Sequence, residues 1–108
     1  MKEFFKNKNI LVTGAGGSIG TEICKTLLTM DIEQVKCFDN SEYSLYRLSK
    51  KLDDPRLRYL IGDVRDKERL DRAVTDADIV IHAAALKHVY FCEFNPDEAY
   101  KTNVLGTQ

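Results

Sequence analysis

A run of glycines lies between an apolar segment and an amphipathic one. The run is Thr13-Gly14-Ala15-Gly16-Gly17-Ser18-Ile19-Gly20, and the apolar residues 10–12 precede it. A glycine turn that opens a helix presents backbone N–H groups and the positive end of the helix dipole, and both bind phosphate. We predict that Gly14 permits the turn, Gly17 lets the backbone approach a pyrophosphate, and Gly20 lets the helix pack closely on a sheet.

The glycine spacing alone is weak evidence for a dinucleotide site. It differs from the usual GxGxxG pattern, because Ile19 stands where the third glycine would fall. The context is stronger, since Asp39 ends the next predicted strand, where a carboxylate accepts hydrogen bonds from an adenosine ribose. The alternative is a glycine turn that only packs well, with Asp39 as a solvated strand end. A P-loop is excluded because no Gly-Lys-Ser/Thr follows.

Residues near the C-terminus have competing interpretations. His82, His88 and Cys92 follow no standard zinc spacing and lack a fourth ligand, so we expect no metal site. Lys87 follows a predicted strand at the carboxyl edge of a parallel sheet, where ligands bind. The ordinary alternative for Lys87 is a solvated surface charge.

Short apolar runs alternate with longer amphipathic ones, and this predicts strands separated by helices. The predicted strands are 10–12, Gln34–Asp39, Leu57–Ile61 and Ile79–His82. Ser41 and Asp66 are the expected caps of the second and third helices. The order βαβαβαβα implies an α/β, Rossmann-type, doubly wound parallel sheet with right-handed crossovers, and we expect the strand order 3-2-1-4.

A fourth helix is predicted near the C-terminus. Asn95 is its expected cap, Pro96 takes the first helical position, and Glu98 lies three residues after the cap. We expect this helix to continue through Val104. No stop signal follows it, so we interpret residues 1–108 as the N-terminal, dinucleotide-binding part of a larger Rossmann domain.

Composition excludes several classes of protein. The 108 residues allow one domain with a modest core. The 16 Lys+Arg balance 17 Asp+Glu, and a net charge of -1 lacks the basic footprint of a nucleic-acid-binding protein. Aromatic residues at 90, 91 and 94 are therefore expected in the core or a subunit contact. No apolar run approaches the roughly 20 residues of a membrane span.

The N-terminus is too short and polar for a signal peptide. The three cysteines are an odd number without paired spacing. We interpret them as reduced thiols of a cytoplasmic protein.

Several segments together resemble a known family. The Thr-Gly-x-x-Gly-x-x-Gly sequence is similar to that of the extended short-chain dehydrogenase/reductase superfamily. The rest of the chain resembles its polysaccharide-biosynthesis branch, the UDP-N-acetylglucosamine 4,6-dehydratases. This narrower resemblance rests on Phe38-Asp39-Asn40-Ser41-Glu42-Tyr43, Gly62-Asp63-Val64-Arg65-Asp66, His82-Ala83-Ala84-Ala85-Leu86-Lys87-His88-Val89, Glu93-x-Asn95-Pro96 and Lys101-Thr102-Asn103-Val104-x-Gly106-Thr107.

The resemblance implies a reaction and a cofactor. Such enzymes use a tightly held nicotinamide to oxidise C4 of the sugar, eliminate water across C5 and C6, and return the hydride to C6. A nucleotide sugar of the UDP-N-acetylglucosamine class is the implied substrate, and the intact enzyme is expected to be a homo-oligomer. The alternatives are another extended short-chain enzyme, such as a nucleotide-sugar epimerase, and a non-catalytic dinucleotide-binding module.

The choice between NAD and NADP depends on the residues after the second predicted strand. Asp39 would repel a 2′-phosphate, and the residues that follow it are neutral or acidic, so we expect NAD. Arg47, on the following helix, keeps NADP open as the alternative.

The resemblance also assigns individual residues. The expected contacts with the cofactor are Gly14, Gly17, Ser18, Ile19 and Gly20 at the pyrophosphate, Asp39, Asn40 and Ser41 at the adenosine ribose, Asp63 and Val64 at the adenine, and Ala83, Ala84 and Ala85 at the nicotinamide ribose and phosphates. The expected residues near the substrate are Lys87, which also approaches the cofactor, and Asn103.

The superfamily's catalytic Tyr-x-x-x-Lys belongs beyond residue 108, after a fifth strand. We therefore expect no catalytic residue and no turnover in residues 1–108. Tyr46 and Lys50 have the same spacing. However, they lie on the predicted helix at the adenosine side of the sheet, away from the sugar, so we interpret them as surface residues.

Overall fold

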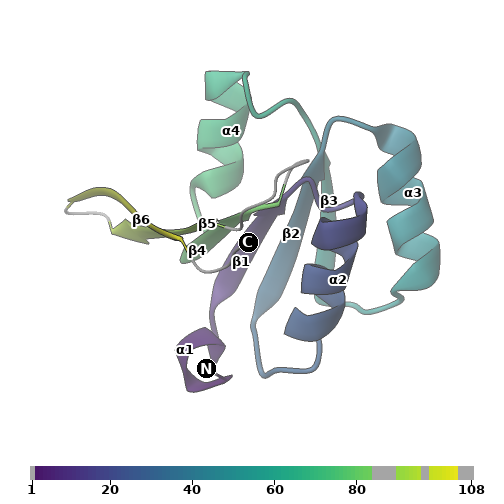
Figure 1. Ribbon diagram of the computed structural model, residues 1–108, viewed down its shortest axis with the longest axis horizontal. Helices are drawn as coiled ribbons and strands as arrows, with labels where there is room; N and C mark the ends of the chain where they lie inside the picture. The colour runs from purple at the N-terminus through teal and green to yellow at the C-terminus, as the bar shows by residue number, and fades with distance from the viewer. Residues whose placement is uncertain (1, 84–89, 96–97, 105–108) are drawn as a thin grey trace.

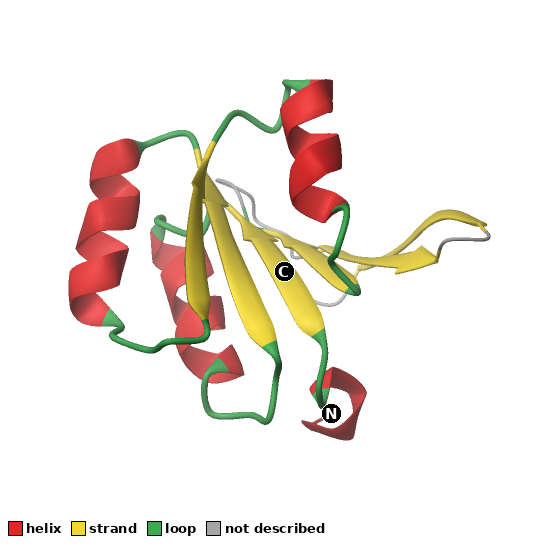
Figure 2. Ribbon diagram, turned by 180° about the vertical axis from the view of Figure 1, so that it is seen from behind, coloured by secondary structure: helices red, strands yellow, loops and turns green. Residues whose placement is uncertain are grey.

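The computed structural model describes residues 2–83, 90–95 and 98–104, and the side chains of residues 3–83. Its centre is a six-stranded sheet with the order β3-β2-β1-β4-β5-β6, with helices on both faces (Figure 1, Figure 2). The elements in chain order are α1 (Lys2–Phe5), β1 (Asn9–Thr13), α2 (Ser18–Leu27), β2 (Gln34–Asp39), α3 (Glu42–Lys51), β3 (Leu57–Ile61), α4 (Lys67–Val74), β4 (Ile79–His82), β5 (Tyr90–Asn95) and β6 (Glu98–Val104).

Four of the strands form a parallel sheet. β1 pairs with β2 and β4, and β2 pairs with β3, all parallel. Helices α2 and α3 cover one face of this sheet and α4 covers the other (Figure 1). The predicted Rossmann-like α/β fold and the strand order 3-2-1-4 are confirmed. The chain changes direction across the sheet between β1 and β4, and ligands of such sheets bind beyond the carboxyl ends of the strands at this point.

The central strands are buried on both faces. Ile10 and Val12 of β1 belong to the core beneath α2 and α3, while Leu11 belongs to a second core beneath α4. Strand β4 alternates in the same way, with Ile79 and Ile81 in the first core and Val80 in the second. This burial explains why both strands are continuous apolar runs in the sequence.

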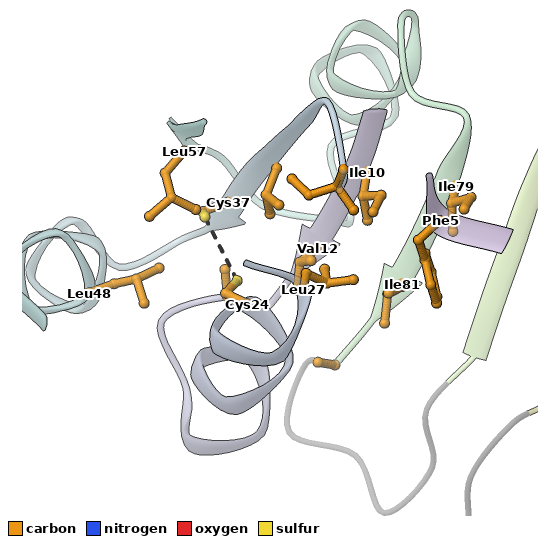
Figure 3. Packing of buried hydrophobic residues seen from close by; sticks show 14 of the residues in the cluster. Phe5, Ile10, Val12, Cys24, Leu27, Cys37, Leu48, Leu57, Ile79 and Ile81 are labelled. Atoms are coloured by element: carbon orange, nitrogen blue, oxygen red, sulfur yellow. Dashed lines mark hydrogen bonds between the residues drawn. The ribbon is translucent and has the colours of Figure 1, made fainter. Parts of the chain in front are cut away.

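Two thiols lie side by side in the first core. Sγ of Cys24, on α2, is 3.8 Å from Sγ of Cys37, on β2, and both cysteines are free (Figure 3). The hydrogen bond with Cys24 and burial raise the pKa of Cys37 far above its usual range. Both sulfur atoms therefore act as packing groups between helix and sheet.

The helices begin in two different ways. The Ser41 hydroxyl accepts from the Ser44 amide at 3.1 Å, and the Asp66 carboxylate accepts from the Arg69 amide at 3.2 Å, so the two predicted caps are confirmed. Helix α2 instead begins after Gly17, with no side-chain cap and no acidic residue in its first turn.

No helix in the described part of the chain is long and apolar enough to cross a membrane.

The predicted helix from Asn95 to Val104 is wrong. The structure has strand β5 ending at Asn95, antiparallel to β4, and strand β6 over Glu98–Val104, antiparallel to β5. Asn-Pro dipeptides mark turns as well as helix starts, and Asn95 pairs with Glu98 at the end of the ladder. Aromatic and β-branched residues favour strands in both segments. Pairing with β5 also supplies hydrogen bonds to the edge of β4.

Candidate functional site

The glycine loop makes a tight turn between β1 and α2. Gly14 has φ 68°, in the left-handed region that favours glycine. The Gly17 amide donates to the Gly14 carbonyl at 3.1 Å, and the Ala15 amide donates to the Phe38 carbonyl of β2 at 3.2 Å. The Thr21 hydroxyl donates to the Ala15 carbonyl at 3.2 Å. The prediction that Gly14 permits the turn is confirmed.

Two further glycines of the loop are required by packing. A Cβ atom on Gly20 would collide with the Gly14 carbonyl oxygen and would lie 2.7 Å from Cα of Ala15. A Cβ atom on Gly16 would collide with Cβ of Ser44, on α3. Gly20 therefore lets α2 pack closely on the backbone of Gly14 and Ala15, directly after β1, whereas no role was predicted for Gly16.

Gly17 is different, because the protein's own packing does not require a glycine there. The nearest atom to an added Cβ would be the Gly14 carbonyl oxygen at 3.5 Å, an ordinary contact. Gly17 is exposed and precedes α2, whose first N–H groups have no acceptor within the helix. A loop of this kind fits the pyrophosphate of a dinucleotide, since it offers amide donors, the positive end of a helix and an open approach.

Asp39 connects the end of β2 to the glycine loop. Its Oδ2 accepts from the Gly16 amide at 2.9 Å, and its Oδ1 accepts from the Ser41 amide at 3.0 Å. Each carboxylate oxygen can accept more than one hydrogen bond. Asp39 can therefore hold the loop and still accept hydrogen bonds from the hydroxyl groups of a ribose.

A cavity of about 360 Å³ brings most of the predicted adenosine-side residues together. The predicted residues that line it are Gly14, Gly17, Asp39, Asn40, Ser41, Asp63 and Val64. Phe38, Ser44 and Gly62 line it as well, although their residue types and spacing predicted no role in a site. Gly62 comes directly before the predicted adenine pair, which is a signal that could have identified it. Phe38 resembled an ordinary core residue of a strand.

Asp63 is fixed at the rim of this cavity by Arg65. Their side chains form an ion pair of 2.7 Å, and the Arg65 amide also donates to Oδ1 of Asp63 at 2.8 Å. These hydrogen bonds from Arg65 lower the pKa of Asp63 to about 2. Val64, beside it, is 38% exposed. A charged acceptor next to an exposed apolar side chain fits a flat base that carries an amino group.

Ser18 and Ile19 lie at the start of α2, and Ile19 is 43% exposed. Both line a separate apolar cavity of about 550 Å³, together with Ile81 of β4. Ala83 is buried after β4, and its amide donates to the Thr13 carbonyl at 3.0 Å. Ser18 and Ile19 follow β1 and Ala83 follows β4, while the apolar cavity extends along α2 as far as Phe5, Leu27 and Met30.

The remaining predicted residues are less defined. Ala84, Ala85 and Lys87 lie outside the described residues. Asn103 lies in β6, opposite Phe91 of β5, so two strands separate it from β1. Its side chain is not described, and its expected role stays a prediction.

Two features of the sequence imitate functional motifs: the spacing of Tyr46 and Lys50, and the group of His82, His88 and Cys92. Tyr46 is 58% exposed on α3, with Nζ of Lys50 5.3 Å from its ring centroid, and neither residue lines the Asp39 cavity. Among the described side chains, no group of three or more His, Cys, Asp or Glu residues could hold a metal ion. The side chains of His88 and Cys92 lie outside that part of the chain, so the expected absence of a metal there stays a prediction.

His82 has a partner in the sheet instead. Its Nδ1 lies 3.0 Å from the hydroxyl oxygen of Thr13, at the ends of β4 and β1. Burial lowers the pKa of His82. The neutral imidazole therefore links the two strands that flank the point where the chain changes direction.

Comparison with known proteins adds relatives along the whole chain. Residues 10–108 match the polysaccharide biosynthesis protein family. The chain is 54% identical over 108 residues to an uncharacterized membrane protein of Methanocaldococcus jannaschii and covers 32% of that protein. It is 46% identical over 105 residues to the inverting UDP-N-acetylglucosamine 4,6-dehydratase of Campylobacter jejuni, covering 31%. It is 40% identical over 108 residues to the UDP-glucose 4-epimerase of Rickettsia felis, covering 32%.

Several solved structures are similar in fold to this chain. Pen from Bacillus thuringiensis is 40% identical with a TM-score of 0.73, and the match covers 79% of this chain and 27% of Pen. An NAD complex of dTDP-glucose 4,6-dehydratase from Bacillus anthracis is 27% identical with a TM-score of 0.61, covering 71% and 26%. An NADP complex of a short-chain dehydrogenase/reductase from Veillonella parvula is 27% identical with a TM-score of 0.58, covering 69% and 34%.

These matches show which family the chain belongs to and how much of its relatives' length it covers. The chain spans about a third of the length of the curated relatives that it matches. The family match includes the glycine loop, Asp39 and the segment around Asp63, which the fold brings together. The chain belongs to the polysaccharide biosynthesis protein family, within the extended short-chain dehydrogenases/reductases.

Proposed function

We propose that this chain is the NAD-binding part of a nucleotide-sugar 4,6-dehydratase of the UDP-N-acetylglucosamine class. The observation that carries the proposal is the cavity in which the glycine loop, Asp39 and Asp63 meet. These residues come from the ends of β1, β2 and β3, which the parallel sheet places along one edge. The NAD complex of the related dTDP-glucose 4,6-dehydratase supports the same cofactor here.

The pyrophosphate half of the site depends on main-chain groups. In this proposal, the amides at the start of α2, from Ser18 to Gly20, donate to the pyrophosphate, and the helix dipole favours its charge. The absence of an acidic residue in the first turn of α2 supports this role. Gly17 contributes by leaving the approach open, because a larger side chain would occupy the ligand's path.

The adenosine half depends on two carboxylates. Asp39 accepts hydrogen bonds from the ribose hydroxyl groups, with Asn40 and Ser41 beside it. Asp63 accepts from the amino group of adenine, and Val64 packs on the base. Arg65 holds the Asp63 carboxylate in position through their ion pair.

The nicotinamide half is assigned to the ends of β1 and β4. We assign Ala83, Ala84, Ala85 and Lys87 to this region, with Asn103 near the substrate. The bound nicotinamide supplies hydride acceptance from C4 of the sugar and hydride return to C6. The small side chains at 83–85 keep the backbone accessible for close contact.

A nucleotide-sugar epimerase is the second candidate, because the chain is 40% identical to a UDP-glucose 4-epimerase. The dehydratase is preferred on the higher identity of 46% to a UDP-N-acetylglucosamine 4,6-dehydratase. The test is to incubate the intact enzyme, of which residues 1–108 are the proposed N-terminal part, with UDP-N-acetylglucosamine and with UDP-glucose and to follow the products by NMR. A 4-keto-6-deoxy product supports the dehydratase. Epimers at C4 without a keto product would contradict it and support the epimerase.

A further inference from the structure

The apolar cavity of about 550 Å³ lies along α2 and shares no lining residue with the cavity around Asp39. Phe5 of α1 and Ile81 of β4 are part of its lining (Figure 3). Helix α2 and the turn that follows it supply the rest. Ile19, at the start of α2, is 43% exposed, so the cavity opens to solvent. The proposed adenosine site therefore leaves this cavity without a role.

The α2 side of this cavity has the form of a helix-packing surface. Two rows of residues, each with a spacing of four, line it, and they are Ile19, Ile23 and Leu27 in one row and Glu22, Thr26 and Met30 in the other. On a helix, such rows form adjacent ridges, and the groove between them accepts a ridge of side chains from a second helix. The cavity is therefore shaped for another helix.

Helix α2 is apolar over more than the face that packs on the sheet. Cys24 and Leu27 are its buried side chains in the core. Ile23 and Met30 are only partly buried beside them, and Ile19 is exposed. A surface helix needs one apolar stripe towards its core. The second stripe of α2 therefore indicates a second packing partner.

The helices over the sheet place this partner beside β4. Helix α2 packs on β1 and β2, and α3 packs on β2 and β3. Helix α4 covers the opposite face (Figure 1). Ile81 of β4 belongs to the core beneath α2 and also lines the cavity. Parallel sheets of α/β proteins carry helices on both faces, so a helix next to α2 on the β4 side would extend this layer across the sheet.

The length of the relatives and the polarity of the cavity indicate what fills it. The chain spans about a third of the length of its curated relatives, so two-thirds of proteins of this kind lies outside the matched region. A small-molecule site usually aims a few polar groups at its ligand. Here Ser18, Glu22 and Thr26, the polar residues of the lining, all belong to α2. Polar groups therefore do not converge on a ligand from different elements, and a protein segment fits the cavity better.

We propose that the cavity along α2 and β4 receives an amphipathic helix from the part of the intact protein outside residues 1–108. The apolar side of that helix packs between the two rows of α2 and against Phe5 and Ile81, and its polar side faces solvent. The inference goes beyond the proposed function, because it depends on the fold and on the length of the relatives, and not on the cofactor or the sugar. A second copy of the chain is the competing occupant.

The first experiment compares two thiols on α2 in the intact enzyme, of which residues 1–108 are the proposed N-terminal part. Thr26→Cys places a thiol in the cavity, and Lys25→Cys, the matched control, places one beside it. Both native side chains are exposed in the structure of residues 1–108. Peptide mass spectrometry measures their rates of modification by N-ethylmaleimide. Thr26→Cys should react at least about thirtyfold more slowly, because a covered thiol reacts only when the structure opens. Equal rates in the folded enzyme would overturn the inference.

A pair of truncations in the intact enzyme gives an independent measurement. Ile19 and Ile61 are 43% and 48% exposed, and Ile61 lies on β3 at the edge of the sheet. Alanine favours a helix and disfavours a strand, so without a docked helix Ile19→Ala should cost less stability than Ile61→Ala. The proposal predicts the reverse, with a larger fall in the urea midpoint for Ile19→Ala. A smaller or equal fall would contradict it.

Cross-linking then identifies the occupant. Glu22→Cys, in the second row of α2, carries a short photo-activated cross-linker, and mass spectrometry identifies the joined peptides. We expect a cross-link within one polypeptide, to a peptide outside residues 1–108. A product with the mass of two chains would assign the cavity to a second copy, and cross-links only within residues 1–108 would show that no such helix docks there. Either result would overturn the inference and leave the proposed cofactor site untouched.

Discussion

The amide nitrogen of Gly16 lies 2.9 Å from Oδ2 of Asp39 and donates a hydrogen bond to it. This contact joins the glycine loop to the end of β2. The other oxygen of the same carboxylate accepts from the Ser41 amide at 3.0 Å, at the start of α3. One side chain thus fixes the loop proposed for the pyrophosphate and the strand end proposed for the ribose. A change at Asp39 should therefore affect both halves of the site.

The first prediction concerns Asp39→Ser. Loss of the carboxylate removes charged hydrogen bonds to the ribose and the restraint on the loop, so NAD should bind about tenfold more weakly or worse. NADP should lose less, because the repulsion of its 2′-phosphate disappears as well. Calorimetry with both cofactors measures the change in preference, with the exposed Asp76→Ser as control. A wild type that binds NADP more tightly than NAD would contradict the assignment of Asp39.

Gly20 and Gly17 should differ in what they contribute to stability. Gly20→Ala places a methyl group against the Gly14 carbonyl and the backbone of Ala15, so it should lower the free energy of unfolding by roughly 1–3 kcal/mol. Gly17→Ala meets only an ordinary 3.5 Å contact and should change stability much less. Urea denaturation compares the two variants. Equal losses would show that the packing of the loop on α2 is not as described.

The third prediction is a pH dependence of stability that arises at His82. Burial lowers the pKa of His82 in the folded protein below its ordinary value of about 6.5. The unfolded chain therefore binds more protons in the window below that value, and stability should fall as the pH drops through it. Above about pH 7 the imidazole is neutral in both states and contributes no pH dependence.

His82→Gln tests this interpretation, because an amide can still bond to Thr13 but does not titrate. The variant should lose part of the decrease in stability between pH 8 and pH 5.5, as measured by urea denaturation. His88 is present in both proteins, so the difference between them reports on His82. The same pH dependence in both proteins would assign it to other groups.

Tyr46 should have no part in catalysis, although its spacing to Lys50 matches the catalytic pattern of the superfamily. It is 58% exposed on α3 and lies outside the cavity around Asp39. Tyr46→Phe in the intact enzyme, of which residues 1–108 are the proposed N-terminal part, should retain turnover of the nucleotide sugar within about twofold. A loss of a hundredfold or more, the range of general acid–base catalysis, would reverse this interpretation.

The parts of the fold that the sequence predicted correctly are those with strong local signals. The buried runs of β1 and β4 are apolar on both faces, and the caps at Ser41 and Asp66 carry the side chains that caps require. The segment from Asn95 to Val104 lacked such a decisive signal. Its Asn-Pro dipeptide fits a helix start and a turn equally well. Its strand character depends on pairing with β5, which in turn pairs with β4 of the parallel sheet, and this is a tertiary contact.

In the site, too, the residues with local sequence signals were predicted, and those that depend on tertiary packing were not. Glycine spacing and the end of the second strand predicted Gly14 and Asp39, whereas the segment at Asp63 came from the family resemblance. The structure brings all three to one cavity, because parallel strands place their carboxyl ends along one edge. The requirement for glycine at Gly16 depends on Ser44, which is distant in sequence and adjacent only through the packing of α3. A further cavity, lined by Gly16, Glu22 of α2 and Arg47 of α3 among others, depends on how the two helices pack, and no local pattern contains that information.

The most direct test of this account is calorimetry of NAD binding to the wild type and to Gly17→Glu. Position 17 tolerates a Cβ atom, so the variant should fold, but its carboxylate would project where the pyrophosphate is proposed to bind. We predict that the wild type binds NAD and that the variant, with an unchanged unfolding temperature, binds at least a hundredfold more weakly. Equal affinity of the two folded proteins for NAD would contradict a dinucleotide site at the glycine loop.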